Sequence, residues 1–262
     1  MQSDFSVFER RFRDYADTFR NADGSLDFPI RCKIEHTFNV CRTAEKICRR
    51  EGLTDRETHV FLLCALFHDL SRFEQFRKFR TFRDAESFDH GDRSEELMLS
   101  GGFLRDVPSG VKAVVACAVR LHNKLQIPPD TPPESLPAVR MVRDADKLDI
   151  LNLVYEFFTN PEKSDPTLRL ELPASPGCSD PILQAVLEGK SVRYSDLRNV
   201  NDFILALFSW APHLHYSASA QLALERKLYD HLYTLLKLPD GRADSLPGLT
   251  EKRLREIAEK HS

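Results

Sequence analysis

The sequence contains no long apolar run. A transmembrane helix needs about 20 predominantly apolar residues, and no such segment occurs in the 262-residue chain. The opening stretch, MQSDFSVFERRFRDY, is charged and rich in phenylalanine, unlike the apolar centre of a secretory signal peptide. We therefore expect neither a membrane span nor a secretory signal.

An excess of charge of one sign is also missing. The chain has 37 lysines and arginines against 40 aspartates and glutamates, which gives a formal net charge of −3. Surfaces that bind nucleic-acid polymers or anionic membranes usually carry a strong positive excess. The sequence thus predicts neither of these partners, and it leaves open whether the chain forms a homo-oligomer.

Paired cysteine motifs are absent too. The six cysteines show no CxxC pair and no zinc-ribbon spacing. Cys64 and Cys117 lie within apolar helical runs, where a free cysteine behaves as a small hydrophobic residue. These features favour free thiols and a reducing, cytoplasmic location.

Alternating strand patterns are lacking, and helical periodicity dominates the sequence. We predict an all-α helical bundle that forms a single domain over residues 1–262, with residues 160–262 as a helical cap packed on the rest. The predicted helices cover residues 4–20, 34–51, 55–70, 91–100, 108–124, 136–159, 181–189, 196–211, 216–238 and 248–260.

Polar residues stand where this pattern predicts buried positions. The apolar run Phe61–Phe67 ends directly in His68 and Asp69, and a charge in such a place normally needs a partner or a metal. Phenylalanines and arginines then interleave over residues 72–83, which predicts a packed, lid-like segment.

Three further residues share this character. His36 heads the apolar face of its predicted helix, and His122 stands at the tail of another. Asp146 lies in the middle of an apolar face, with apolar residues four positions before and after it. Asp144 lies about 200° away around the same helix, so we favour Asp146 as the functional carboxylate.

Each of these residues alone also fits a hydrogen-bonded core histidine or a buried aspartate that joins two helices. Together, imidazoles and carboxylates on buried faces of one bundle suit one or two divalent ions, among them Fe, Mn, Zn, Co, Ni or Mg. In a site with two ions, a bridging aspartate is a way of using few carboxylates.

The order His36, His68-Asp69, Asp146 resembles the H…HD…D signature of the HD-domain metal-dependent phosphohydrolase superfamily. The phrases KIEHTFNVCRTAEKI (33–47), LFHDLSRFEQ (66–75) and VRDADKLDIL (142–151) carry the resemblance, which makes residues 30–155 the metal-site core. DHGDRS (89–94) and VRLHNK (119–124) are similar to the two extra histidines of binuclear members. The resemblance therefore implies six metal ligands: His36, His68, Asp69, His90, His122 and Asp146.

The family likeness also implies an activity. We expect hydrolysis of a phosphate ester, in a nucleotide or another small phosphorylated metabolite, by a hydroxide that the metals activate, with Asp69 as the bridging catalytic carboxylate. Many binuclear members carry a lysine three positions after the HD aspartate, where this chain has Arg72. We expect Arg72 to contact the phosphate. Lys147 and Arg77 are further substrate-binding candidates. No Gly-Tyr-Pro motif follows His122, which argues against a cyclic-di-GMP phosphodiesterase of the HD-GYP type.

Three alternatives stay open from the sequence. The same six ligands suit a di-iron oxygenase of the HD type. A non-catalytic, ligand-binding HD protein with a structural metal is the second alternative. The third is a mononuclear site, in which His90 and His122 contact the phosphate instead of a second ion.

Overall fold

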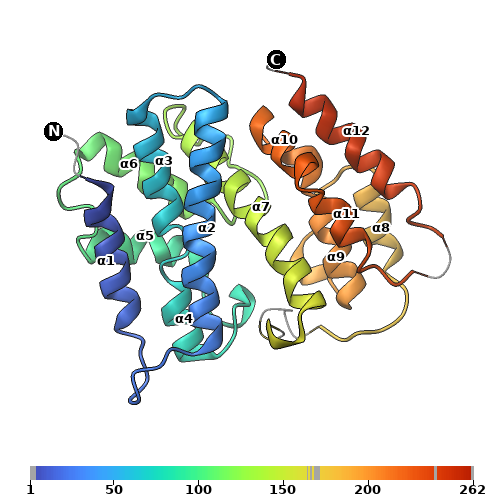
Figure 1. Ribbon diagram of the computed structural model, residues 1–262, viewed down its shortest axis with the longest axis horizontal. Coiled ribbons are helices and arrows are strands. Elements are labelled where there is room, and N and C mark those ends of the chain that lie inside the picture. The colour runs from blue at the N-terminus through green and yellow to red at the C-terminus, as the bar shows by residue number, and fades with distance from the viewer. Residues whose placement is uncertain (1–3, 164, 166, 168–171, 239–240, 261–262) are drawn as a thin grey trace. The chain divides into compact units, whose positions relative to one another are not determined.

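The computed structural model describes residues 4–163, 165, 167, 172–238 and 241–260. All regular secondary structure among these residues is helical, which confirms the predicted all-α class (Figure 1). The chain divides into two compact units, Met1–Asp146 and Lys147–Ser262. No helix among the described residues combines the length and the apolar character that crossing a membrane would require.

The first unit contains six complete helices and the beginning of a seventh. These are α1 (Phe5–Asp17), α2 (Phe28–Arg50), α3 (Asp55–Phe67), α4 (Arg72–Phe79), α5 (His90–Ser100), α6 (Ser109–Leu121) and the first part of α7 (Leu136–Thr159), with the 3₁₀ turn η1 (Asp84–Glu86) before α5.

Helix α3 lies at the centre of this unit and packs against α1, α2 and α6. Its start is fixed by a capping box: Glu57 N donates to Thr54 Oγ1 at 3.3 Å, and Thr54 N donates to Glu57 Oε2 at 2.9 Å. From Leu63 to Phe67 every side chain is completely buried. A helix that is apolar around its whole circumference requires such a central position.

The first part of the phenylalanine- and arginine-rich segment, predicted as packed and lid-like, forms the helix α4. Phe73 is 1% exposed and its ring meets those of Phe12, Tyr15 and Phe19, with centroids 5.7–6.0 Å apart. Phe79, at the other end of the helix, is 45% exposed. The segment is therefore anchored in the aromatic core through its first turn.

Two predicted helices differ most from the observed ones, and the ends of the others agree within four residues. Helix α2 begins at Phe28 instead of residue 34, because Asp27 takes the N-cap position and Pro29 suits a first helical turn. The predicted helix 216–238 is two helices, α10 (Ser217–Glu225) and α11 (Leu228–Tyr233). The chain breaks between them at Lys227, whose φ of 51° is left-handed.

The second unit contains the remainder of α7, α8 (Asp180–Leu187), α9 (Val200–Phe208), α10, α11 and α12 (Leu246–Ala258), with short 3₁₀ turns. Asp202 of α9 is fully buried, and its carboxylate accepts hydrogen bonds from Ser179 N and Ser179 Oγ at 2.7 and 2.6 Å. It thereby ties the start of α8 to α9.

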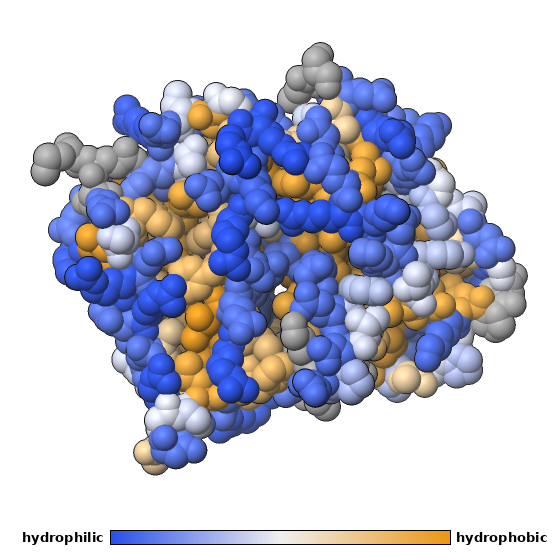
Figure 2. Space-filling model, viewed as in Figure 1, coloured by the Kyte–Doolittle hydropathy of each residue, from blue (hydrophilic) through white to orange (hydrophobic). Residues whose placement is uncertain are grey.

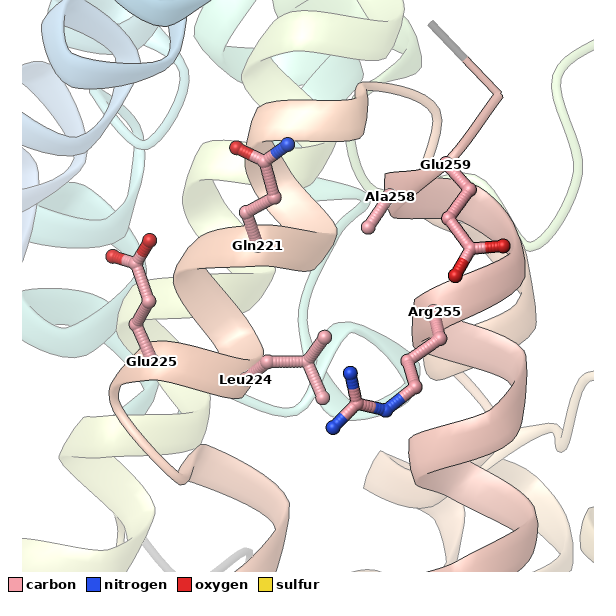
Figure 3. Close-up of a pocket in the computed structure, with 6 residues that line it drawn as sticks. All are labelled: Gln221, Leu224, Glu225, Arg255, Ala258 and Glu259. Carbon is pink, nitrogen blue, oxygen red and sulfur yellow. The ribbon is translucent and has the colours of Figure 1, made fainter. Parts of the chain in front are cut away.

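A hollow lies between α10 and α12 in the second unit (Figure 3). Its lining is Gln221, Leu224, Glu225, Arg255, Ala258 and Glu259. None of these is a predicted site residue. On the face shown in Figure 2, hydrophilic residues predominate, and hydrophobic atoms show between them in patches.

Candidate metal centre

The C-terminal end of α3 supplies the first two residues of the candidate site. His68 is the C-cap of α3, and Asp69 follows it; they are 0% and 4% exposed. The last carbonyls of a helix have no partner within the helix, and His68 Nδ1 uses one of them by donating to Ala65 O at 2.7 Å. In the neutral imidazole this bond places the lone pair on Nε2, which lies 3.3 Å from His36 Nε2.

His122 repeats this arrangement at the end of α6. It is the C-cap of that helix, and its Nδ1 donates to Val119 O, also three residues back and also at 2.7 Å. Two helices thus end in a buried histidine whose Nδ1 proton is used locally and whose Nε2 lone pair is available to a ligand.

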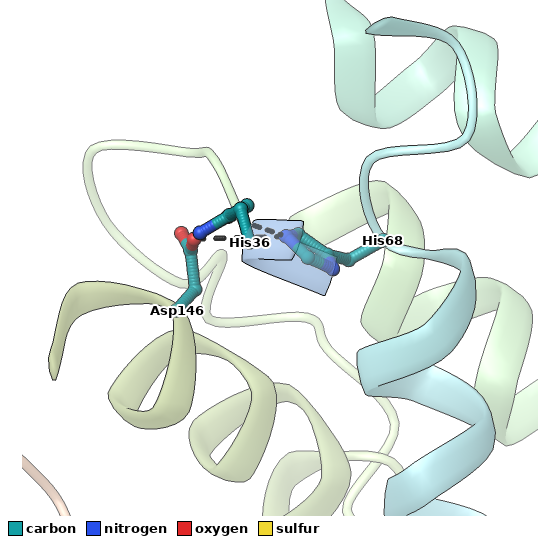
Figure 4. A group of neighbouring side chains, drawn as sticks. All are labelled: His36, His68 and Asp146. Carbon is teal, nitrogen blue, oxygen red and sulfur yellow. Dashed lines mark hydrogen bonds and ion pairs between the residues drawn. The ribbon is translucent and has the colours of Figure 1, made fainter. Parts of the chain in front are cut away.

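His36 and Asp146 join His68 from two other helices (Figure 4). His36 lies in α2 and Asp146 in α7. His36 Nε2 is 3.0 Å from Asp146 Oδ1 and 3.3 Å from His68 Nε2. These three side chains place their donor atoms close enough together to hold one metal ion.

His90 faces His122 in a second pair. His90 is the first residue of α5, and its Nε2 lies 3.1 Å from Nε2 of His122. Its Nδ1 donates to Asp84 Oδ2 at 2.5 Å. A histidine whose far nitrogen donates to a carboxylate is the usual arrangement of a metal ligand.

Asp69 lies between the two pairs and turns one oxygen to each. Its Oδ2 is 3.6 Å from His36 Nε2 and 3.5 Å from His68 Nε2. Its Oδ1 is 3.6 Å from His90 Nε2 and 3.7 Å from His122 Nε2. His68, Asp69 and His122, one histidine from each pair with the aspartate between them, form a second group of donors that could hold an ion; His90 belongs to neither group.

Both carboxylates of the cluster are held in the ionised form that a metal ligand needs. Burial disfavours the charge of Asp69, but the ammonium of Lys33, together with His68, His122 and Arg72, outweighs this effect and holds the pKa of the carboxyl well below its usual range. Burial likewise opposes the charge of Asp146, yet a hydrogen bond from His36 keeps its pKa well below the usual range.

The donor set fits a cation best at the His90–His122 pair. Both imidazoles use their Nδ1 proton elsewhere, so the two Nε2 atoms at 3.1 Å are both hydrogen-bond acceptors. Burial and the neighbouring guanidinium of Arg72 lower the pKa of His90 to about 4, which keeps its ring neutral. Two facing lone pairs repel each other unless a positive charge lies near both. Arg72 Nη2, 3.2 Å from His90 Nε2, presents such a charge to one of them, and a divalent ion between the rings would present it to both.

Two cationic side chains approach the same aspartate. Lys33 Nζ lies 2.6 Å from Asp69 Oδ2, and Arg72 Nε lies 3.4 Å from Asp69 Oδ1. Both cations also face the ring of Phe82, at 5.4 and 5.6 Å from its centroid. Arg72 was predicted from the sequence and Lys33 was not, although Lys33 stands one helical turn before His36 and this spacing could have suggested it.

Arg72 is fixed by several acceptors besides Asp69. Its Nη1 donates to Asp84 Oδ1 at 3.0 Å and to the Phe82 carbonyl at 2.7 Å, and its Nη2 lies 3.2 Å from His90 Nε2. Asp84 therefore joins Arg72 to His90. Asp84 was not predicted, because in the sequence it is a single charged residue between predicted helices, with no motif or spacing that marks it.

The remaining predicted residues have other neighbours. Arg77 donates to the Phe19 carbonyl between α1 and α2, and Lys147 belongs to the second unit, where its Nζ lies 6.0 Å from the ring centroid of Trp210. Their roles in substrate binding stay predictions. Asp144 is completely buried, whereas 14% of the Asp146 side chain is exposed, but Asp144 is not among the donor groups of the centre.

Comparison with known proteins identifies the segment that carries this cluster. The family model of the HD domain matches residues 34–151. Neither the curated proteins nor the solved structures give a significant match. The matched segment includes all six predicted metal ligands and Arg72, and Lys33 directly precedes it. Residues 34–151 therefore match the HD domain, a family whose members are generally metal-dependent hydrolases.

Proposed function

We propose that this protein is a phosphohydrolase that uses two divalent ions, held by its HD domain, to cleave a phosphate ester. The observation that carries the proposal is the orientation of the Asp69 carboxylate, because its two oxygens face two different histidine pairs. A carboxylate arranged in this way suits a bridge between two ions. The substrate class, a nucleotide or another small phosphorylated metabolite, rests on the family likeness alone.

In this proposal His36, His68 and Asp146 hold the first ion, and His90 and His122 hold the second, with Asp69 shared. When bound, the ions would lower the pKa of a coordinated water and polarise the phosphoryl oxygens. The chain itself supplies ligands whose orientation is set in advance, since Ala65 O, Val119 O and Asp84 fix three of the four imidazoles.

Arg72 and Lys33 give the site its positive charge for an anionic substrate. Both lie against Asp69 at the edge of the cluster, and both are mostly buried, with 12% and 14% of the side chain exposed. A phosphate oxygen would interact strongly with cations in such a water-poor setting. We assign to Arg72 the planar, two-pronged contact and to Lys33 a single-point contact.

The test is metal analysis combined with phosphate release. The purified chain is loaded with Mn²⁺ or Co²⁺ under anaerobic conditions and assayed for phosphate release from nucleoside monophosphates, sugar phosphates and p-nitrophenyl phosphate. We expect about two equivalents of metal per chain and turnover that the Asp69→Ala variant loses by about a hundredfold or more. Asp130→Asn, a change at an exposed loop carboxylate, is the control and should behave like the wild type.

Each alternative has its own result in this experiment. One equivalent of metal with turnover would favour the mononuclear site. Oxygen consumption by the iron-loaded chain, without anaerobic phosphate release, would favour the oxygenase. A metal-loaded chain that releases no phosphate from any substrate and consumes no oxygen would contradict the proposal in favour of a ligand-binding protein.

A further inference from the structure

Gly91, the second residue of α5, lies where this helix meets the end of α6. A Cβ atom at Gly91 would come within 2.5 Å of Asn123 Oδ1 and 2.6 Å of the Arg120 carbonyl oxygen. Such distances are far inside van der Waals contact. Because the carbonyl belongs to the backbone of α6, turning the Asn123 side chain would not make enough room. No side chain larger than hydrogen fits there without a movement of one helix.

The two residues beside this contact are the second histidine pair. His90 precedes Gly91 and His122 precedes Asn123, and their Nε2 atoms lie 3.1 Å apart. A displacement of α5 from α6 at Gly91 therefore changes the distance between His90 and His122 directly.

The start of α5 is also held from its other sides. Asp89 caps the helix by accepting from Gly91 N at 3.0 Å, and the same oxygen accepts from Asn123 Nδ2 at 2.9 Å. Ser71 Oγ donates to the His90 carbonyl at 2.9 Å. The position of His90 is thus set by contacts on three sides, and the contact at Gly91 is the one toward α6.

We propose that Gly91 is a positioning residue for the second metal ion: the missing side chain lets α5 close on α6 so that His90 and His122 can share one ion. The inference rests on the proposed two-metal centre. His36, His68 and Asp146 lie in or after other helices, so the first ion does not depend on Gly91.

The experiment compares Mn²⁺ binding by the full-length wild type and the Gly91→Ala variant. Equilibrium dialysis with elemental analysis gives the stoichiometry and affinities, and electron paramagnetic resonance distinguishes a coupled Mn²⁺ pair from an isolated ion. We expect Gly91→Ala to keep the first equivalent and to bind the second about 10- to 100-fold more weakly, as is typical when the support of a metal ligand is disturbed. Its spectrum should change from that of a coupled pair to that of an isolated ion.

Two variants serve as references. Gly110→Ala changes a glycine of α6 whose Cβ would meet nothing within 4 Å, and it should bind Mn²⁺ like the wild type. His90→Ala removes the ligand itself and should give the same single equivalent as Gly91→Ala.

A folded Gly91→Ala variant that binds the second Mn²⁺ with unchanged affinity would overturn the inference, and so would the loss of both equivalents. A wild type that binds one equivalent would overturn it as well, whether or not phosphate is released, so this failure is distinct from failure of the proposed activity.

If Gly91→Ala does not fold, the comparison moves to an Asn123→Ala background, in which the Arg120 carbonyl still obstructs a Cβ at position 91. There Gly91→Ala should again weaken the second equivalent at least about tenfold, and equal affinities would refute the role of Gly91.

Discussion

At the scale of single residues, the cluster depends on what each imidazole does with its second nitrogen. Two histidines donate Nδ1–H to a backbone carbonyl of their own helix, whereas His90 donates to the Asp84 carboxylate. A carboxylate partner makes an imidazole a stronger ligand than a carbonyl does. Asp84 is therefore the side chain outside the ligand set on which the second ion should depend most.

We predict that Asp84→Asn weakens binding of the second Mn²⁺ about 10- to 100-fold and leaves the first equivalent unchanged. The amide keeps the size of the side chain but removes the charge that faces His90 and Arg72. Metal titration followed by elemental analysis measures the effect. Glu86→Gln, at an exposed carboxylate in the same 3₁₀ turn, is the control, and a similar loss in both variants would contradict the prediction.

The thiols give a second prediction at this scale. Five cysteines are buried and Cys178 is partly exposed. Burial raises the pKa of the Cys48 thiol to about 11, so the reactive thiolate is scarce at neutral pH. We expect a maleimide to label Cys178 alone in the native protein at pH 7.5 and all six thiols after denaturation. Mass spectrometry of the digested protein would locate the label, and rapid modification of Cys48 or Cys64 in the native chain would contradict the expectation.

Several site residues could be found from the sequence because their positions on a helix were informative. Asp146 and His36 stand on apolar faces of their predicted helices, and the periodicity favoured Asp146 over Asp144. Burial does not distinguish the two aspartates, because Asp144 is completely buried. For Lys33 the one local signal was its spacing from His36, and Asp84 and Asn123 had none, because exposed-looking charged or polar residues are common in any sequence. Their importance arises from contacts between segments 36–39 residues apart, which the local pattern does not contain.

At the scale of helices, the end of α6 is held by a buried arginine of α7. Arg143 is 6% exposed, and its Nη1 donates to the carbonyls of Leu121, His122 and Lys124 at 3.0, 3.0 and 2.5 Å. These are among the carbonyls that a helix end leaves without partners. One guanidinium thus fixes the backbone of a predicted metal ligand from the helix that also carries Asp146.

We predict that Arg143→Met lowers the free energy of unfolding by roughly 3 kcal/mol, because several buried carbonyls lose their donor. Arg143→Lys should cost less, since an ammonium keeps the charge but satisfies fewer carbonyls. Urea unfolding followed by circular dichroism measures both. Arg140→Met, at an exposed position one turn earlier in α7, is the matched control; equal losses at positions 140 and 143 would refute the capping role.

Helix ends were harder to predict than helix existence. The capping box at Thr54 is a local signal, and the start of α3 at Asp55 agrees with it. The break between α10 and α11 has no such signal, because the left-handed residue is Lys227 rather than glycine. Packing in the second unit overrides the local preference there, so an uninterrupted helix was the natural prediction.

At the scale of the whole chain, the candidate centre belongs entirely to the first unit. All six predicted ligands precede residue 147. The boundary between the units falls inside α7, where neither proline, glycine nor a change in composition marks it. For this reason the sequence suggested one domain, and the role of residues 160–262 as a cap stays a prediction.

We predict that metal removal lowers the melting temperature of the protein. An ion that binds only the folded state adds about 2.7 kcal/mol when its concentration is 100 times its Kd. For a chain of this size that corresponds to several degrees. Differential scanning calorimetry with excess Mn²⁺ and with a chelator measures the shift. In Asp146→Asn the shift should shrink, and a shift of unchanged size in that variant would show that the ion binds elsewhere.

The matching ends of α3 and α6 have a consequence for changes in chain length. His68 and His122 each bond to the carbonyl three residues earlier, so each imidazole is aimed by the phase of its own helix. Inserting one residue within either helix rotates everything beyond it by about 100°, and this would turn the histidine out of the cluster. Insertions and deletions should therefore be tolerated in loops well before these helices, whereas α3 and α6 must keep their present register up to the histidine.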